Sequence, residues 1–317
     1  MYEILILVLS EIGLSLYPQL IKLVDTTVET QLALRFITYS ILAIVISILT
    51  DTVVIKYSLL ENIAFGTINL LHVFTSYLAF KLLSSGTSYT LFYTYPIFNL
   101  IGRSILFNEH FTISQFVYIL CALFGVYLVT NQQTKPMDND DDTARSNTWL
   151  PVSNLKIGII AGLLSAITES IIYLGVKKEI GTTPFQELTR FYILGGVISL
   201  AFVFYSYYNT SKNISSSTYI EDSHTKLSMN LQFDTSLSWE SILGIVLFNA
   251  LVGFIGYVMR FYIIPRITTI KFNSMIFIGI IFAYIWGYLL SSEMIYMENI
   301  LGSLIIIFTI YMINRKV

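Results

Sequence analysis

The sequence predicts an all-α polytopic membrane protein in which ten transmembrane helices form two inverted repeats of five helices each. Three observations lead to this prediction. Of the 317 residues, 55% are hydrophobic and only 12% are charged, whereas a soluble domain usually carries about 25% charged residues. Apolar runs of roughly 20 residues, the length that spans a bilayer, recur along the whole chain. The two halves of the chain also carry the same polar residues at matching positions.

Apolar runs separated by short polar links predict the ten spans. Two longer polar segments interrupt this pattern: residues 131–154 contain four aspartates, and residues 209–238 are rich in Ser, Thr and Asn. Both are typical of solvated loops. We therefore expect a first five-helix repeat at 1–130 and a second one at 155–317, separated by the acidic loop. The expected spans are 3–23, 30–49, 57–83, 86–107, 112–130, 155–177, 184–208, 239–264, 267–290 and 295–314.

Polar residues recur at a fixed offset between the two halves, which indicates an internal repeat. A shift of 184 residues places Glu109 on Glu293, each in the link before the last span of its half. Because each half has an odd number of spans, the second half enters the membrane from the opposite face, and inverted repeats are typical of transporters. A shift of 155 residues places Ser10, Ser15, Lys22, Thr27, Gln31, Arg35 and Phe36 on Ser165, Ser170, Lys177, Thr182, Gln186, Arg190 and Phe191.

Basic residues in short loops favour the cytoplasmic side of a membrane. A cytoplasmic N-terminus places six Lys and Arg residues of the short loops and the tail inside, and only Lys22 outside. We therefore expect both termini in the cytoplasm, although the basic residues of the two long loops make the count even. Asn209 and Asn213 begin N-x-[ST] sequons in loop 209–238 and are glycosylation candidates if that loop is outside or lumenal.

Spans three to five carry the most specific motif, which consists of Ala79, Ser84, Ser85, Gly86, Thr87, Tyr95, Pro96, Glu109, Gln115 and Gly125. This pattern resembles the EamA domain of the drug/metabolite transporter superfamily. Its ten-helix members consist of two five-helix repeats, and the resemblance covers essentially the whole chain. It implies alternating-access transport of a small organic solute through a cavity between the halves. In the second half Ile280 occupies the position of Pro96 and Thr309 that of Gly125, and the lysine-rich signature of the nucleotide-sugar and triose-phosphate branches is not seen.

The expected function is secondary transport of a metabolite, an amino acid or a similar solute, with a proton or a cation as a coupling ion. The alternatives are an antiporter of nucleotide sugars or phosphate esters in the same superfamily, and a membrane channel or structural protein. The sequence has no P-loop and no His-Glu-x-x-His run, so neither an ATPase nor another enzyme is expected. The inverted repeat allows one chain to enclose its own site, so a monomer is the expected functional unit, with a dimer as the alternative.

Composition limits the cofactors and partners. The chain has 18 basic and 20 acidic residues and no basic cluster, so nucleic acid is not an expected partner. Cys121 is the single cysteine and there are three histidines, which argues against a disulfide, a metal site and a cofactor. The expected partners are a small-molecule solute and the lipid bilayer.

Ionisable residues deep in a membrane are costly and are therefore functional candidates. Glu11 and Glu169 each lie eight residues from the expected inner end of an equivalent span, or roughly 12 Å deep. Two carboxylates at one depth predict a site for a proton or a cation; the alternative is that each is hydrogen-bonded to a neighbour and fixes helix packing. His72, on a stripe with Asn69 and Ser76, is the third candidate, and a structural histidine is the alternative there.

Further polar residues extend these positions into stripes on one helix face. The residues that share a face with the two glutamates are Ser15, Pro18, Lys22, Ser165 and Tyr173. On span four, Tyr95, Asn99 and Arg103 share a face beside Pro96, whose missing N–H interrupts the backbone hydrogen bonds of the helix. This face is expected to line the cavity; the alternative is that Pro96 only produces a kink for helix packing. Four basic residues lie near helix ends, where their side chains reach the interface: Lys81, Arg103, Arg260 and Lys271. The expected cavity residues are Glu11, Glu169, His72, Tyr95, Asn99, Ser15 and Tyr173.

Overall fold

The computed structural model is helical, with no strand in the part of the chain that it describes. Six helical stretches in this part are long and apolar enough to cross a membrane: Tyr2–Leu23, Val28–Leu49, Leu59–Leu82, Asn154–Lys178, Pro184–Asn209 and Trp239–Ile263. Three shorter apolar helices accompany them: Val117–Thr130, Ile278–Ser291 and Met297–Met312. The described residues are 2–52, 56–107, 112–131, 152–178, 181–214, 233–267, 272–273 and 275–315.

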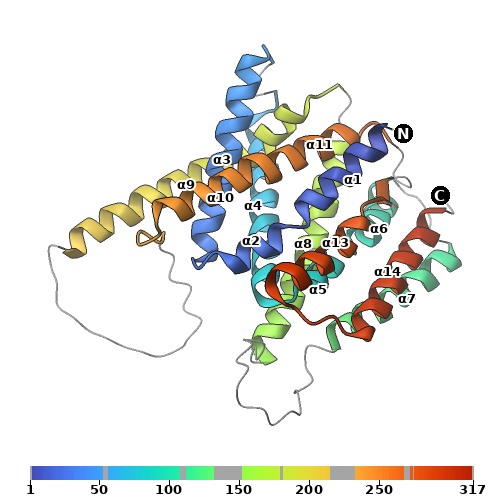
Figure 1. Ribbon diagram of the computed structural model, residues 1–317. Helices are drawn as coiled ribbons and strands as arrows, with labels where there is room; N and C mark the ends of the chain where they lie inside the picture. The colour runs from blue at the N-terminus through green and yellow to red at the C-terminus, as the bar shows by residue number, and fades with distance from the viewer. Residues whose placement is uncertain are drawn as a thin grey trace, which may run out of the picture.

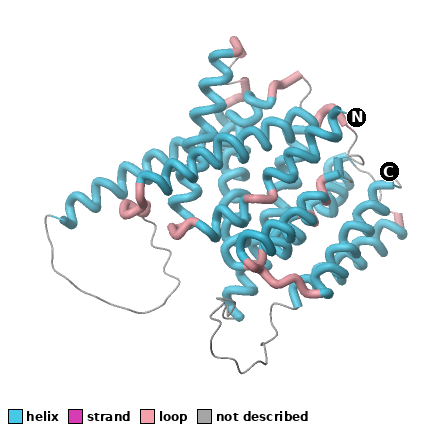
Figure 2. The backbone as a smooth tube through the Cα atoms, in the orientation of Figure 1, coloured by secondary structure: helices cyan, strands magenta, loops and turns pink. Residues whose placement is uncertain are grey.

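The helices follow one another with short links (Figures 1 and 2). The first half contains α1 (Tyr2–Leu14), α2 (Tyr17–Leu23), α3 (Val28–Leu49), α4 (Leu59–Leu82), α5 (Ser85–Phe92), α6 (Tyr95–Phe107) and α7 (Ile113–Asn131). The second half contains α8 (Val152–Lys178), α9 (Pro184–Ile214), α10 (Trp239–Phe248), the π-helix η2 (Asn249–Phe254), α11 (Ile255–Ile263), α13 (Ile278–Ser291) and α14 (Met297–Arg315).

Polar caps start two helices of the first half. Ser58 and Glu61 form a capping box at α4, in which each side chain bonds the backbone N–H of the other residue. At α5 the Ser84 hydroxyl accepts a hydrogen bond from the backbone N–H of Thr87 at 3.4 Å. Such caps satisfy N–H groups that have no partner inside the helix, and they fix where each helix begins.

The expected first span is broken between α1 and α2, at Ser15 and Leu16. Pro18 explains the break, because it has no N–H to offer the carbonyl of Leu14 and its ring crowds that carbonyl. The hydroxyl of Tyr89 donates to the Leu14 carbonyl instead. The prediction of one continuous helix, with a single polar stripe along it, is therefore wrong for this span.

The expected fourth span is broken in the same way, at Tyr93 and Thr94, between α5 and α6. Pro96 lies in the first turn of α6, where its missing N–H removes a bond that would have continued α5. The expected ninth span is also shorter as a regular helix, because α13 begins only at Ile278.

Helix α9 continues to Ile214, so residues 209–214 are helical and the prediction of a loop from residue 209 is wrong there. The outer half of α9 exposes the aromatic side chains of Phe204, Tyr205, Tyr207 and Tyr208, as is typical of a membrane–water interface. Asn209 follows these aromatic residues directly on the same helix. The Asn213 side chain, and residues 132–151 of the expected acidic loop, lie outside the described residues.

The segment before α10 returns to the start of α3. The backbone N–H of Asp234 donates to Thr30 Oγ1 at 2.8 Å, and the Thr26 hydroxyl donates to Asp234 Oδ2 at 3.0 Å. Hydrogen bonds from the side chain of Ser236, and then from Thr26, keep the pKa of Asp234 below its usual range.

The two halves of the chain pack against each other helix by helix. Helix α3 packs on α9, α4 on α8, α7 on α14, α1 on α11 and α5 on α13; the α7–α14 pair stands out in Figure 1. Glycines allow the closest approach. A Cβ atom at Gly302 would lie 2.6 Å from the carbonyl oxygen of Gly125, so these two helices touch through their backbones, as small residues permit in membranes.

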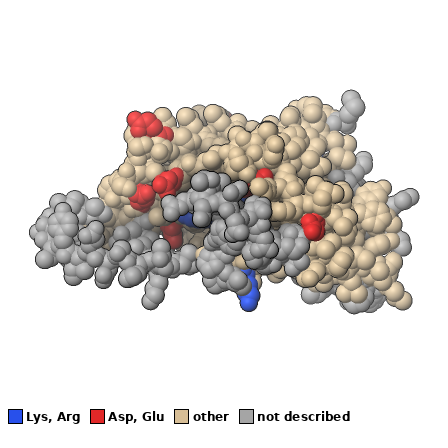
Figure 3. All heavy atoms as spheres, turned by 60° about the horizontal axis from the view of Figure 1, so that its bottom comes forward, with Lys and Arg blue, Asp and Glu red and all other residues tan. Residues whose placement is uncertain are grey.

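The outside of the bundle is apolar. Large hydrophobic side chains are exposed on many helices, among them Leu49, Leu59, Leu60, Leu251 and Phe308. On the face seen in Figure 3, few of the described residues are charged. An apolar surface of this extent requires lipid around it, and the buried polar residues lie inside.

Candidate functional site

Helix α11 carries Arg260 into the middle of the bundle, where its side chain joins the two halves. Arg260 is 1% exposed. Its Nη2 lies 2.8 Å from Glu169 Oε1, and its Nε lies 3.6 Å from Glu11 Oε1. The same Nη2 donates to the hydroxyl of Tyr95 at 3.2 Å. One guanidinium therefore bridges the two carboxylates predicted from the sequence.

Burial explains why these groups are paired. An isolated ion in a low-dielectric interior is strongly unfavourable, so a buried charge needs an opposite charge and hydrogen bonds. Glu11 is fully buried and also accepts a hydrogen bond from the Tyr93 hydroxyl. Its Oε1 has no hydrogen-bond partner, and neither has Arg260 Nε, which faces it at 3.6 Å.

His72 contacts the far side of the Glu169 carboxylate. Its Nε2 lies 3.4 Å from Glu169 Oε2, an oxygen without a hydrogen-bond partner. Its Nδ1 lies 3.1 Å from the carbonyl oxygen of Ser165 and 3.3 Å from Thr168 Oγ1. A carbonyl oxygen only accepts, so Nδ1 carries hydrogen. Nε2 and Oε2 would then face each other as two acceptors unless a proton lies between them.

A second buried arginine, Arg35 on α3, lies in a cage of tyrosine rings and is 2% exposed. Its Nη2 donates to the Tyr192 hydroxyl at 2.8 Å. The ring centres lie 4.5–5.8 Å from its Cζ, within cation–π range. Arg35 has no carboxylate partner among the described residues, and its Nε has no hydrogen-bond partner. The rings are those of Tyr17, Tyr39, Tyr77, Tyr192 and Tyr257.

The π-helix η2 helps to build this cage. The Tyr17 hydroxyl bonds Tyr39 at 2.6 Å and donates to Asn249 Oδ1, the first residue of η2, at 2.9 Å. A Cβ atom at Gly253 would collide with both tyrosine hydroxyls, so only glycine fits there. π-Helical turns often occur at functional sites, and this one lies against two tyrosines of the cage.

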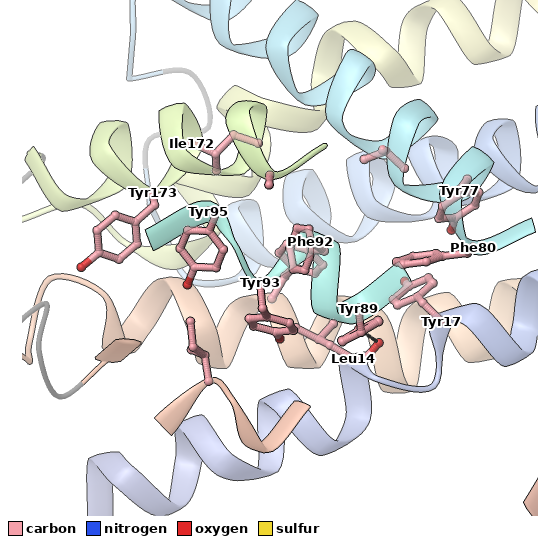
Figure 4. Close-up of a cluster of buried hydrophobic side chains, with 14 of the residues drawn as sticks. Leu14, Tyr17, Tyr77, Phe80, Tyr89, Phe92, Tyr93, Tyr95, Ile172 and Tyr173 are labelled. Atoms are coloured by element: carbon pink, nitrogen blue, oxygen red, sulfur yellow. Dashed lines mark hydrogen bonds between the residues drawn. The ribbon is translucent and has the colours of Figure 1, made fainter. Parts of the chain in front are cut away.

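A small cavity of about 20 Å³, room for about one water molecule, is lined by both arginines. Arg35 and Arg260 share this lining with His72 and Ser76. Aromatic rings follow one another along this region, from Tyr17 and Tyr77 through Phe92 to Tyr173 (Figure 4). The remaining lining residues are Leu14, Tyr17, Phe80, Tyr89, Phe92 and Tyr257.

The other predicted site residues lie around this centre. Tyr173 packs its ring 6.2 Å from that of Tyr95. Asn99 accepts a hydrogen bond from the Ser170 hydroxyl at 2.7 Å and does not line the cavity. Ser15, at the break between α1 and α2, accepts a hydrogen bond from Trp286 Nε1 at 3.1 Å. Ser15 and Asn99 therefore join helices, whereas Glu11, Glu169, His72 and Tyr95 meet at Arg260.

Lys22 belongs to a different cluster from Glu11, because the break at Ser15 turns α2 away from α1. Lys22 pairs with Glu293. Glu293 accepts hydrogen bonds from the backbone N–H of Ser85 at 2.7 Å and from its hydroxyl at 2.9 Å, and Gln19 Nε2 donates to Ser85 Oγ at 2.7 Å. This cluster joins α2, the start of α5 and the link between α13 and α14.

The prediction that Arg260 reaches the interface is wrong. Residues 261, 263, 264 and 267 are also buried, so the end of the apolar run at 264 is not the end of the buried chain. Arg35 appeared in the sequence only as the repeat partner of Arg190, and nothing in its spacing indicated a tyrosine cage. Lys81 lies at the surface end of α4, and the side chains of Arg103 and Lys271 lie outside the described residues.

No three metal-ligating side chains converge within the described ranges. What the centre offers chemically is charge, hydrogen-bond donors and a position for a proton between Glu169 and His72. It contains two guanidinium groups, two carboxylates, one imidazole and several hydroxyls around a cavity.

Comparison with known proteins agrees with this architecture. Residues 1–131 match the model of the EamA-like transporter family. No curated protein matches the chain. Among the solved structures, 24 chains match. One of them, described only as a crystal structure of a protein, is similar over 98% of this chain and 94% of its own length, with a TM-score of 0.56 and 11% identity.

At that identity the solved structure shows a shared fold over nearly the full length of both chains and says nothing of activity. The family model covers the expected first repeat. Residues 1–131 therefore belong to the EamA-like transporter family of the drug/metabolite transporter superfamily, and the chain that contains them is an integral, multi-pass membrane protein.

Proposed function

We propose that the chain is a secondary transporter that moves a small organic solute by alternating access, with a proton as the coupling ion. In this proposal ten spans form two inverted repeats, both termini are cytoplasmic, a single chain encloses the site, and no reaction is catalysed. The solute binds beside Arg260 after the halves move apart to enlarge the small cavity there. The observation that carries the proposal is the buried chain Arg260–Glu169–His72, whose two ends line that cavity.

The pairing of helices supports two related halves. In the expected repeat, α1–α2 corresponds to α8, α3 to α9, α4 to α10–η2–α11, α5–α6 to α13 and α7 to α14. Exchanging the two halves then leaves every major contact between helices in place. The pairs α3–α9, α5–α13 and α7–α14 map onto themselves, and α4–α8 maps onto α11–α1. A two-fold axis in the membrane plane produces this pattern.

Broken helices support a transport site at the centre. Transporters bind solutes where helices are interrupted near the bilayer midplane. Here the break after Leu14, the break after Phe92 and the π-helix η2 all lie beside the cavity or the tyrosine cage. The polar backbone at these breaks is satisfied by side chains, as with the Tyr89 hydroxyl on Leu14.

A proton is the coupling ion that the hydrogen bonds favour. Glu169 Oε2 and His72 Nε2 require one proton between them, and Arg260 already bonds the other oxygen of Glu169. Movement of Arg260 or of bound solute would change the charge next to that proton. The centre is filled by side chains rather than by an open pore, which favours a transporter over a channel.

The test is uptake into proteoliposomes, with and without an inward proton gradient, for wild type, Glu169→Gln and the surface control Glu240→Gln. The amide that Glu169→Gln introduces can donate an N–H to His72 Nε2, so the site no longer needs the shared proton. We expect wild type and Glu240→Gln to show gradient-driven uptake, and Glu169→Gln to retain exchange of solute but lose the response to pH. Non-saturable flux of small ions without solute uptake would contradict the proposal and indicate a channel.

A further inference from the structure

Arg35 differs from every other buried arginine that the structure describes. Arg260 is paired with Glu11 and Glu169, and Arg190 lies 3.4 Å from Glu187. Arg35 is equally buried, yet only aromatic rings and hydroxyls surround it among the described residues. Its Nε lacks a hydrogen-bond partner, as do those of Arg190 and Arg260, and its side chain lines the cavity, as that of Arg260 does.

The charges around the cavity do not cancel when Glu169 and His72 share the proton proposed above. Arg35 and Arg260 contribute two positive charges, and Glu11 contributes one negative charge. The Glu169–His72 pair with its proton is neutral as a whole, wherever that proton lies. In this protonated state the described centre keeps one positive charge, and a net charge in a low-dielectric site is unfavourable until an opposite charge joins it. Loss of the proton restores the balance of charges.

We propose that Arg35 binds the anionic group of the transported solute, and that the solute is a small anion carrying a carboxylate or a phosphate ester, the phosphate ester being bound in its singly charged form. The inference rests on the transport site proposed above and names its substrate class. The singly charged anion supplies the charge that the centre lacks. The tyrosine rings hold the guanidinium in place by cation–π contacts and leave its unpaired N–H for an oxyanion.

The surroundings of Arg35 also fit an oxyanion rather than a cation. A cation would be repelled by the Arg35 guanidinium. The O–H hydrogens of Tyr17 and Tyr39 are used in bonds to each other and to Asn249, so Arg35 is the donor that remains for an oxyanion. Ser76, whose hydroxyl bonds backbone carbonyls of its own helix, and Tyr257 line the same cavity. The cavity of about 20 Å³ is too small for the body of a solute, so binding requires the two halves to move apart, as alternating access supposes.

Arg190 provides a matched control. It occupies the position equivalent to Arg35 in the second repeat, and it also lies against aromatic rings, 4.1 Å above Tyr57 and 3.7 Å above Phe65. Unlike Arg35 it has a carboxylate partner and does not line the cavity. The same substitution at both positions separates the loss of an anion site from the loss of a buried arginine.

The experiment measures the thermal stability of purified protein with matched pairs of solutes: acetate and acetamide, lactate and lactamide, glycerol 3-phosphate and glycerol, with inorganic phosphate alone. A ligand that binds the folded state raises its melting temperature. We expect anions, but not their neutral partners, to raise the melting temperature of wild type and Arg190→Gln by several degrees. Whether carboxylates or phosphates give the larger shift identifies the anionic group.

Arg35→Gln should remove this response, with anion affinity at least about 30-fold weaker, since truncating one partner of a buried charge pair costs roughly 2 kcal/mol or more. Arg35→Lys keeps the charge and should retain a weaker response, which tests the idea if the Gln variant does not fold. Each shift is measured against the variant's own baseline.

Equal responses of Arg35→Gln and wild type, a preference for neutral or cationic solutes, or no anion response in wild type would each overturn the inference. Uptake of a neutral solute in the proteoliposome assay would support the transporter proposal and contradict the proposal that the solute is an anion. Anion binding without any uptake would support the anion site and contradict the transporter proposal.

Discussion

At the scale of single residues, the structure depends on each buried charge having a partner. Arg260 holds two carboxylates from opposite halves of the chain, and Glu169 is further contacted by His72. Breaking a buried ion pair by removing one partner is much more costly than replacing the whole pair, because the remaining charge stays in a low-dielectric site.

This asymmetry predicts the effect of Arg260→Met. The variant leaves Glu11 and Glu169 without their cation, so we expect a loss of about 3–5 kcal/mol of stability, seen as a lower melting temperature of the purified protein. Arg266→Met, at an exposed arginine six residues on, should change little. The triple variant Arg260→Met, Glu11→Gln, Glu169→Gln should recover much of the loss. A triple variant no more stable than Arg260→Met would show that Arg260 does not stabilise the protein by balancing the charges of Glu11 and Glu169.

Part of the site follows from the sequence and part does not. Glu11, Glu169 and His72 stood out because each is an ionisable residue far inside an apolar run. The structure brings both glutamates to one arginine and places His72 on the far side of Glu169. Arg260 was misplaced because hydropathy locates the end of an apolar run and not the end of the buried chain. The cage of Arg35 draws tyrosines from α2, α3, α4, α9 and α11, and that convergence depends on tertiary packing that no local pattern encodes.

At the scale of helices, the interruptions matter more than the helices themselves. Pro18 and Pro96 break two expected spans, and the carbonyl left free at Leu14 is bonded by Tyr89. The sequence predicted the opening at Pro96 because proline has no N–H. It did not predict the π-helix η2, which contains no proline and no unusual spacing, nor the continuation of α9 to Ile214.

The contact between α7 and α14 depends on two glycines. A Cβ at Gly302 would lie 2.6 Å from the Gly125 carbonyl oxygen, so Gly302→Val should push the helices apart. We expect a destabilisation of roughly 1–3 kcal/mol or more from this overpacking, measured as a lower melting temperature. Gly244→Val is the control, since a Cβ there meets nothing within 4 Å and valine favours a helix slightly more than glycine does. Similar melting temperatures for the two variants would show that α7 and α14 do not need this close approach.

At the scale of the whole molecule, composition and span length were sufficient for an all-helical, multi-pass membrane protein, and the motif of spans three to five was sufficient for the family of residues 1–131. The ten-span count and the inverted repeat remain predictions. They rest on the offsets between the halves and on helix contacts that are unchanged when the halves are exchanged. The equivalence of Glu109 and Glu293 involves residue 109, outside the described residues.

Alternating access requires that the cavity open to each side of the membrane in turn, and thiol labelling measures this. Ser76 lines the cavity and is buried, and Cys121 is the single native cysteine. In a Cys121→Ser background, Ser76→Cys is labelled with a small membrane-impermeant thiol reagent applied to either face of sealed vesicles. Ser236→Cys, in the exposed segment before α10, is the control for sidedness.

We expect that Ser76→Cys reacts from both faces, that the shared proton or bound solute shifts the ratio of the two rates, and that Ser236→Cys reacts from one face only. Labelling of Ser76→Cys from a single face under all conditions, or from neither, would contradict alternating access at this centre.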